Sequence, residues 1–402
     1  MRKSKIENLD SEIEDLAAQP EQESEIIRIK KQLLSENLIG CGSTMVNLNC
    51  TNTPYGCFLK GRYYLIVGAS GAGKTWISMS IFGEAKIHPF FKNHKLIFDN
   101  KEEGADMDWG FYFGDSAANC IKAPCPDRIG YYDKDGEVSF VDGKGKTAFA
   151  ADYSVDIEDF YDNMDNQLNE AERTGTGFIY VLDSMDSLSS KKLFEEIEEA
   201  KKARVKGDEV KGSYGDGKAK INSQRLKMIT SRLSRTGSIL VIICQERDNL
   251  GYGGGKTFTG GNALPFYACG QFWLKSKSDI TAVINKKERP LGTLTHCDIR
   301  KNRMTGLRSR KLEISFYHSF GIDDIGDMIQ FLLDEGHWEG GKQEKSAIIA
   351  PEFESEELNK EGLARFIDCG HLKDQLVDIV WKVWNDLQET IESKVSRRRR
   401  YE

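Results

Sequence analysis

The stretch GRYYLIVGASGAGKT, residues 61–75, decides the fold class of this chain. Its first half is an apolar and aromatic run typical of a buried strand, and a helix-like run follows Thr75. Between them lies the pattern GxxxxGKT, whose glycines permit a tight loop with backbone N–H groups that point inward at phosphate oxygens. A strand, such a loop and a helix in this order predict a site for a nucleoside triphosphate.

The residues of this loop have separate expected roles. Lys74 supplies a positive charge to the β- and γ-phosphates, and the Thr75 hydroxyl ligates Mg²⁺. The backbone of the preceding residues surrounds the phosphates, and these residues are Gly68, Ala69, Ser70, Gly71, Ala72 and Gly73. The alternative is a glycine-rich turn with a chance lysine, which leaves the strand before the loop and the helix after it unexplained.

Two acidic residues are expected beside the phosphates. The run FIYVLD, residues 178–183, is a buried strand whose terminal Asp183 can hold a magnesium-bound water beside the phosphate loop. The strand KLIF, residues 95–98, leads into DNKEE, where we select Glu102 as the base that orients or deprotonates water. Glu103 competes for this role, and a solvated acidic turn is the alternative interpretation.

The pattern from about residue 36 to residue 340 predicts the architecture. Short β-branched or aromatic runs alternate there with helix-length amphipathic segments, and the runs are 63–67, 95–98, 178–182, 238–244, 270–274 and 312–316. This alternation predicts an α/β fold with a mainly parallel central sheet that helices cover on both faces. The later runs are closer together, which indicates antiparallel strands at the end of the sheet. Residues 191–220 and 246–259 have the composition of mobile insertions.

Two charged segments flank this core. Residues 1–35 carry a narrow apolar stripe, which predicts a helix that packs on its own core, packs on a neighbouring chain for oligomerisation, or stays mobile. Residues 341–402 predict a charged appendix with one helix from Leu372 to Ile391, whose Trp381 and Trp384 we expect to pack against the core. The basic run 397–400 could contact DNA phosphates, but such a tail is more often solvated.

Composition limits the compartment and the partners. The chain of 402 residues is 39% hydrophobic with a net charge of −7, which excludes a wholly disordered protein and one coated in nucleic acid, but not a local basic channel. Its nine cysteines lack framework spacing, so free thiols are expected, and Cys120 and Cys125 lack further ligands for zinc. No apolar stretch is long enough to cross a bilayer and residues 1–16 lack a signal-peptide core, so we expect a cytoplasmic protein without a membrane partner.

A later segment resembles a known family. ILVIICQER (239–247), the glycine-rich loop after it and TGGNALPFYA (259–268) resemble RecA-type recombinases, in which a strand ends in a glutamine, a mobile DNA-binding loop follows and a TGGNAL helix start comes next. The segment 300–303 is similar to the family's Lys-Asn-Lys segment, with Arg303 in place of a lysine. FYHSFGIDDIGD (316–327) is similar to the end of the family's core. The resemblance spans about residues 38–338, and phage recombinases of the UvsX kind are the more similar branch.

This resemblance implies a RecA-like, DNA-dependent ATPase, phage-encoded and acting in the host cytoplasm, with ATP and Mg²⁺ as cofactors. Gln245 would sense the γ-phosphate, while Lys301 and Arg303 would complete the ATP site of a neighbouring subunit in a homo-oligomeric filament. A first DNA-binding loop would lie within 190–220. Contacts from the second loop and the helix start would come from Arg247, Lys256, Phe258, Gly260, Gly261 and Asn262.

The implied function is filament formation on single-stranded DNA, followed by homologous pairing with double-stranded DNA and strand exchange in recombination and repair. The loop's composition agrees, because flexible glycines, two cations and one aromatic ring suit single strands. Two other functions stay open. A ring-forming RecA-fold helicase would not be expected to carry TGGNAL. A recombination mediator with weak hydrolysis is disfavoured by Lys74, Thr75 and Asp183, but Glu102, displaced by one residue from the family's base, keeps it open.

Overall fold

The computed structural model describes residues 34–132, 138–140, 147–206, 217–248, 256–308, 311–341, 346–353 and 358–395. The helix expected within 1–35 lies outside these ranges apart from its last two residues, and the basic run 397–400 lies outside them altogether.

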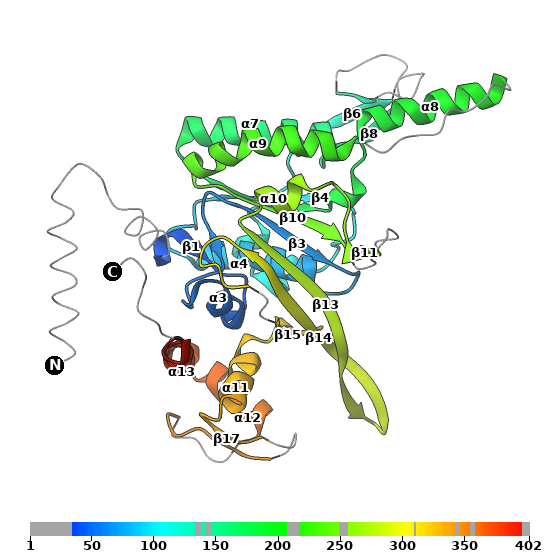
Figure 1. The fold of residues 1–402 in the computed structure, drawn as a ribbon. Coiled ribbons are helices and arrows are strands. Elements are labelled where there is room, and N and C mark those ends of the chain that lie inside the picture. The colour runs from blue at the N-terminus through cyan, green and yellow to red at the C-terminus, as the bar shows by residue number, and fades with distance from the viewer. Residues whose placement is uncertain are drawn as a thin grey trace, which may run out of the picture.

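A central sheet organises the described part of the chain (Figure 1). Its nine described strands follow the order β16-β15-β14-β13-β3-β10-β9-β4-β5. Their bounds are β3 (Tyr63–Gly68), β4 (Lys95–Asn100), β5 (Ile121–Lys122), β9 (Phe178–Asp183), β10 (Ile239–Gln245), β13 (Gly270–Ile284), β14 (Lys287–Asn302), β15 (Lys311–Tyr317) and β16 (Gly321–Ile322). Neighbouring strands from β5 to β13 are parallel, and those from β13 to β16 are antiparallel. The predicted α/β fold, with a mainly parallel sheet that ends in antiparallel strands, is confirmed.

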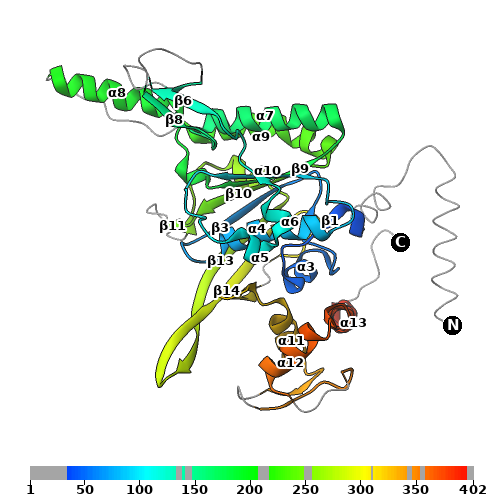
Figure 2. The ribbon, with the colours of Figure 1, turned by 180° about the vertical axis from the view of Figure 1, so that it is seen from behind.

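Helices cover both faces of this sheet, and therefore its inner strands are apolar on both sides. Helices α7 (Ile157–Thr174) and α9 (Lys218–Thr236) lie on one face, and α3 (Thr44–Thr51) and α4 (Lys74–Ile87) lie on the other, as Figures 1 and 2 show. The residues of β3 divide between the two faces: Leu65 and Val67 join the apolar cluster of α7 and α9, while Tyr64 and Ile66 join that of α4.

The structure corrects several expectations. Strands β13 and β14 form a long hairpin that runs beyond the sheet, and β14 was not predicted because much of it is exposed and polar. Within the expected mobile insertion 191–220, the helix α8 (Lys191–Lys206) projects from the body. Between α6 (Asp115–Ala118) and α7, three short described strands form an unpredicted sheet, namely β6 (Ile129–Tyr132), β7 (Val138–Ser139) and β8 (Thr147–Ala150).

The C-terminal appendix shares the apolar cluster of the α4 face. Helix α11 (Asp324–Asp334) packs against α12 (Lys360–Cys369), which was not predicted, and against α13 (Lys373–Val395), which contains the expected helix. The buried Trp384 donates its Nε1–H to Asn52 Oδ1 at 3.2 Å, and Trp381 donates to the Asn52 carbonyl at 3.1 Å. Both tryptophans therefore pack against the core, as predicted. The short strands β1 (Leu38–Ile39) and β2 (Phe58–Leu59) pair with each other, as do β17 (Glu339–Gly340) and β18 (Ile348–Ile349).

Strand β15 packs against the phosphate loop, and helix α11 holds β15 in place. A side chain at Gly73 would lie 2.6 Å from the ring of Phe316 in β15, so the loop backbone rests directly on that ring. Asp327 of α11 fixes Ser315, the residue before Phe316. Its carboxylate accepts hydrogen bonds from the Ser315 N–H at 3.1 Å and the Ser315 hydroxyl at 2.7 Å. Burial raises the pKa of Asp327 to about 7 in spite of these bonds.

This raised pKa predicts a pH-dependent stability. The folded chain binds more protons than the unfolded chain between the ordinary aspartate pKa of 3.8 and about 7, so stability falls as the pH rises through this range. We expect Asp327→Asn to remove this pH dependence. The unfolding free energy of the variant minus that of the wild type should therefore increase by on the order of 2 kcal/mol from pH 5 to pH 8. Urea unfolding at both pH values measures the gain. Asp334→Asn, on an exposed position of the same helix, should follow the wild type, and an equal effect of Asp327→Asn at both pH values would contradict the prediction.

Candidate active site

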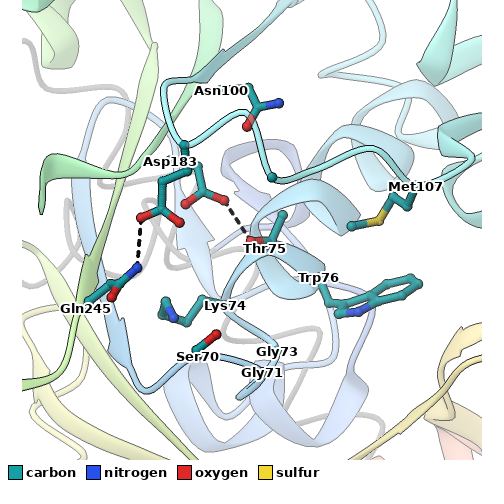
Figure 3. A pocket seen from close by; sticks show the side chains of 12 residues that line it. Ser70, Gly71, Gly73, Lys74, Thr75, Trp76, Asn100, Met107, Asp183 and Gln245 are labelled. Carbon is teal, nitrogen blue, oxygen red and sulfur yellow. Dashed lines mark hydrogen bonds between the residues drawn. The ribbon is translucent and has the colours of Figure 1, made fainter. Parts of the chain in front are cut away.

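A cavity of about 370 Å³ lies at the carboxyl ends of the parallel strands (Figure 3). The phosphate loop, the start of α4, the segment after β4 and the last residues of β9 and β10 form its walls. Its lining residues are Ser70, Gly71, Gly73, Lys74, Thr75, Trp76, Asn100, Glu102, Gly104, Met107, Asp183 and Gln245. In open parallel sheets, this edge is where ligands bind.

The loop between β3 and α4 has the backbone that an anion site needs. Gly71 and Gly73 have φ values of 73° and 86°, which residues with a side chain rarely adopt. At Gly68 a Cβ would lie 2.5 Å from the Leu274 carbonyl oxygen, so a larger residue does not fit there. Gly73 is the N-cap of α4, and no side chain among the described residues caps it. The first N–H groups of α4 therefore remain available to an anion in the cavity.

The structure places Lys74, Thr75 and Asp183 together. The largely buried Lys74 donates to the Ala69 carbonyl at 2.8 Å, and burial lowers the pKa of Lys74 although Asp183 and Glu102 oppose this shift. The Thr75 hydroxyl donates to Asp183 Oδ2 at 2.7 Å. Burial raises the pKa of Asp183 to about 6 against that hydrogen bond. An anionic ligand beside Lys74 would favour its charged form.

The same corner of the cavity fits Mg²⁺. The Thr75 hydroxyl and the Asp183 carboxylate offer oxygen atoms, which this ion prefers. Asn100 lines the cavity beside them, and its buried Oδ1 has no hydrogen-bond partner among the described residues. The residues present therefore suit a magnesium ion that keeps several waters and binds a phosphate.

The two candidate glutamates have different positions. Both glutamates are exposed, but Glu102 lines the cavity and Glu103 does not. Glu102 Oε1 accepts hydrogen bonds from Gln245 Nε2 at 3.0 Å, from the Ser187 hydroxyl at 3.4 Å and from the Ser184 hydroxyl. A carboxylate held by three donors has a fixed orientation. Sequence reasoning missed both serines, although they follow directly in DSMDSL, residues 183–188.

The segment after Gln245 forms the neck of the expected second loop. Strand β11 (Arg247–Asp248) pairs antiparallel with β12 (Lys256–Thr257), and residues 249–255 lie outside the described part. Arg247 lies 3.3 Å from Asp186, and Lys256 lies 2.9 Å from Asp248. Both basic side chains are about half exposed and paired with acids. Phe258 is partly buried with its ring 6.0 Å from that of Trp273, so it packs on the core, and its expected contact with DNA stays a prediction.

The TGGNAL segment returns the chain to the core. Gly260, with a φ of 103°, is buried, and its carbonyl accepts from Asn222 Nδ2 at 2.8 Å. A Cβ at Gly261 would lie 2.5 Å from the Ala219 side chain, so both glycines permit close packing on α9. Asn262 precedes α10 (Ala263–Tyr267) and is exposed. Of these three residues, Asn262 therefore has the side chain that solvent reaches.

Lys301 and Arg303, at the end of β14 and just after it, do not line the cavity of their own chain. Lys301 donates to the carbonyls of Pro265 and Phe266 at 2.5 and 2.8 Å, and Arg303 donates to the Phe266 carbonyl at 2.8 Å. Burial, with Arg303 nearby, lowers the pKa of Lys301 to about 8. The two cations thus lie at the C-terminal end of α10, where they can meet another molecule.

The remaining candidates for a site are the cysteines and the possible metal ligands of the described residues. All nine cysteines are free thiols, as predicted, and Cys125 Sγ lies 2.9 Å from Asn163 Oδ1. The described ranges hold no group of three or more His, Cys, Asp or Glu side chains suited to a metal ion. No helix in them is both long and apolar enough to cross a membrane.

Comparison with known proteins identifies relatives of this chain. Residues 136–323 match the family model of the RecA N-terminal domain. This range includes Asp183, Gln245, Lys301 and Arg303, whereas the phosphate loop and Glu102 precede it.

Individual relatives agree with this family match. Protein RecA of Bacteroides thetaiotaomicron is 29% identical over 208 residues, which cover 47% of this chain and 57% of the relative. Protein RecA of Caulobacter sp. strain K31 is 26% identical over 283 residues, 69% of this chain and 63% of the relative. The chain thus spans about three fifths of the length of these two relatives. The expected resemblance is confirmed at modest identity.

Proposed function

Because this chain is a relative of the RecA-type recombinases, we propose that it is a DNA-dependent ATPase that forms filaments on single-stranded DNA and promotes homologous pairing and strand exchange. The observation that carries this proposal is the hydrogen bond of 3.0 Å between Gln245 and Glu102. It joins the last residue before the proposed DNA-binding loop to the acid beside the proposed phosphate site. A ligand of either site would therefore act on the other.

In the proposed reaction, the loop N–H groups and Lys74 bind the β- and γ-phosphates of ATP. Thr75 and Asp183 would hold Mg²⁺, which neutralises phosphate charge. Glu102, held by Ser184 and Ser187, orients a water molecule and accepts its proton as the oxygen–phosphorus bond forms and the bond to the leaving ADP oxygen breaks. The Gln245 amide, free to turn from Glu102 to the γ-phosphate, would report whether that phosphate is present.

The basic loop neck supports single-stranded DNA as the partner. Arg247 and Lys256 expose about half of their side chains on one β-ribbon, where they can exchange their acidic partners for DNA phosphates. The segment 190–220, which includes α8, is the proposed second contact to DNA.

A site completed by a neighbouring subunit supports the filament. Lys301 and Arg303 do not line the cavity of their own chain and lie against the C-terminal end of α10, where they are proposed to contact the ATP of the next subunit. A head-to-tail interface that does not close into a ring produces a helical filament. Residues 1–35 are the proposed oligomerisation segment of a cytoplasmic protein, followed by the core 36–340 and the appendix 341–402.

A prediction for the proposed base concerns Glu102. We expect wild-type ATP hydrolysis to be stimulated by single-stranded DNA, with helical filaments in negative-stain micrographs. Glu102→Gln should reduce the stimulated rate at least ~100-fold while fluorescent ATP still binds, because loss of a general base affects turnover and not phosphate binding. Glu103→Gln, the matched control on the exposed neighbour, should keep the wild-type rate. Closed rings, or a wild-type rate that DNA does not change, would contradict the proposed function.

A further prediction concerns the ATP site that two subunits are proposed to share. Lys74→Ala and Lys301→Ala should each abolish turnover, the first by removing the phosphate contact within a subunit and the second by removing the contact to its neighbour. In an equal mixture, an interface between a Lys301→Ala cavity and a Lys74→Ala neighbour has both lysines. By random assembly about a quarter of interfaces are of this kind, so the mixture should recover up to about a quarter of wild-type hydrolysis. No recovery in mixtures that still form filaments would contradict a site shared between subunits.

A further inference from the structure

Asp186 receives three groups from the two ends of the 246–259 loop. It lies in the short helix η2 (Met185–Ser187), directly after the β9 strand, and 5% of its side chain is exposed. Its Oδ2 accepts the Gln245 backbone N–H at 2.6 Å. Its Oδ1 accepts the Thr259 hydroxyl and lies 3.3 Å from the Arg247 guanidinium. One buried carboxylate thus links the residue before the loop, a basic residue at its start and the last residue of the loop.

The partners of Asp186 differ in what can displace them. Burial of a carboxylate is costly unless hydrogen bonds compensate, so the bonds from Gln245 and Thr259 hold this group in place. Arg247 is the exposed partner, with 54% of its side chain accessible. A DNA phosphate can therefore compete for Arg247 without entering the core. Binding of a strand would leave Asp186 with its two neutral donors and remove the charge of Arg247.

This change would reach the cavity through Gln245. The Gln245 backbone N–H is held by Asp186, and its side chain is held by Glu102. On the other side, the next residue is tied to the phosphate loop, since the Glu246 N–H donates to the Gly68 carbonyl at 3.0 Å. The backbone at Gln245 is thus held by Asp186 on one side and by Gly68 on the other. Of these two residues, Asp186 is the one that also contacts Thr259, the last residue of the loop.

We infer that Asp186 is a positioning residue that transmits DNA binding at Arg247 and Thr259 to Gln245 and so to the ATP site. The inference rests on the proposed function and deepens it, because it assigns the link between the two sites to one carboxylate. Asp186 touches neither nucleotide nor DNA. Its effect is on where Gln245 lies when a strand is bound.

The test compares Asp186→Asn with Asp248→Asn. The first substitution keeps the side-chain shape and an acceptor oxygen for Gln245 but removes the charge that holds Arg247. The second removes a carboxylate from the same loop neck that pairs with Lys256 and contacts neither Gln245 nor Thr259. ATP hydrolysis with and without single-stranded oligonucleotide, the KM for ATP and the oligonucleotide Kd are measured for the full-length wild type and both variants.

For Asp186→Asn we expect the stimulation of kcat by DNA to fall at least ~10-fold. Its KM for ATP should stay within ~2-fold of wild type, because Asp186 does not line the cavity. Its oligonucleotide Kd should be unchanged or tighter, since Arg247 no longer has a competing anion. Asp248→Asn should keep the wild-type stimulation. A purely structural role would predict a different pattern, in which stimulation and DNA binding are lost together.

Three results would overturn the inference. Full stimulation of Asp186→Asn shows that the coupling uses another route while the proposed function stands. Loss of oligonucleotide binding together with stimulation shows that Asp186 maintains the loop's structure and does not transmit binding. A wild-type rate that DNA leaves unchanged refutes the proposed function and the coupling with it.

Discussion

The parallel register of four neighbouring strands is the constraint on which the rest of the structure depends. Gly68 of β3 pairs with Gln245 of β10, and Asp183 of β9 pairs with Asn100 of β4, so the strand ends align at one edge of the sheet. The candidate phosphate loop, the candidate magnesium ligand Asp183, a candidate base and a candidate sensor meet there although 177 residues, from 68 to 245, separate the outermost of them. The helices on both faces bury the strands and so fix this register.

Acidic groups crowd this edge, and the hydrogen bonds that hold them also organise the chemistry. Glu102 has Ser184, Ser187 and Gln245, while Asp183 has Thr75. Burial raises the pKa of Asp183 and lowers that of Lys74, so burial disfavours the charged forms of both groups. A ligand with negative phosphates and a cation would restore both charges. In the proposed function, the burial of these groups would cost the protein some stability and would favour binding of Mg·ATP.

The sequence predicted what local pattern determines and missed what depends on contacts between distant residues. The buried strands, the phosphate loop and Asp183 follow from apolar runs and turn chemistry, while the end of β10 at Gln245 follows from the family resemblance. Strand β14 was not predicted because its exposed part lacks an apolar run. Helix α8 was not predicted because its many charged residues were interpreted as a mobile insertion. The choice between Glu102 and Glu103 required the backbone that turns one of them into the cavity. Asp186 gains its role only when residues 245, 247 and 259 converge on it.

We propose that nucleotide binding in the cavity and DNA binding at the 246–259 loop are coupled. The affinity for a fluorescent single-stranded oligonucleotide, measured in the presence and absence of nucleotide, tests this coupling most directly. Coupling between two binding sites is reciprocal, so if a bound strand changes the affinity for ATP, ATP must change the affinity for the strand by the same factor. With a non-hydrolysable ATP analogue and Mg²⁺, we predict a Kd at least ~10-fold tighter than without nucleotide, which corresponds to about 1.4 kcal/mol of coupling. With ADP in its place, the Kd should return toward the nucleotide-free value. Equal affinities under all three conditions would contradict the account.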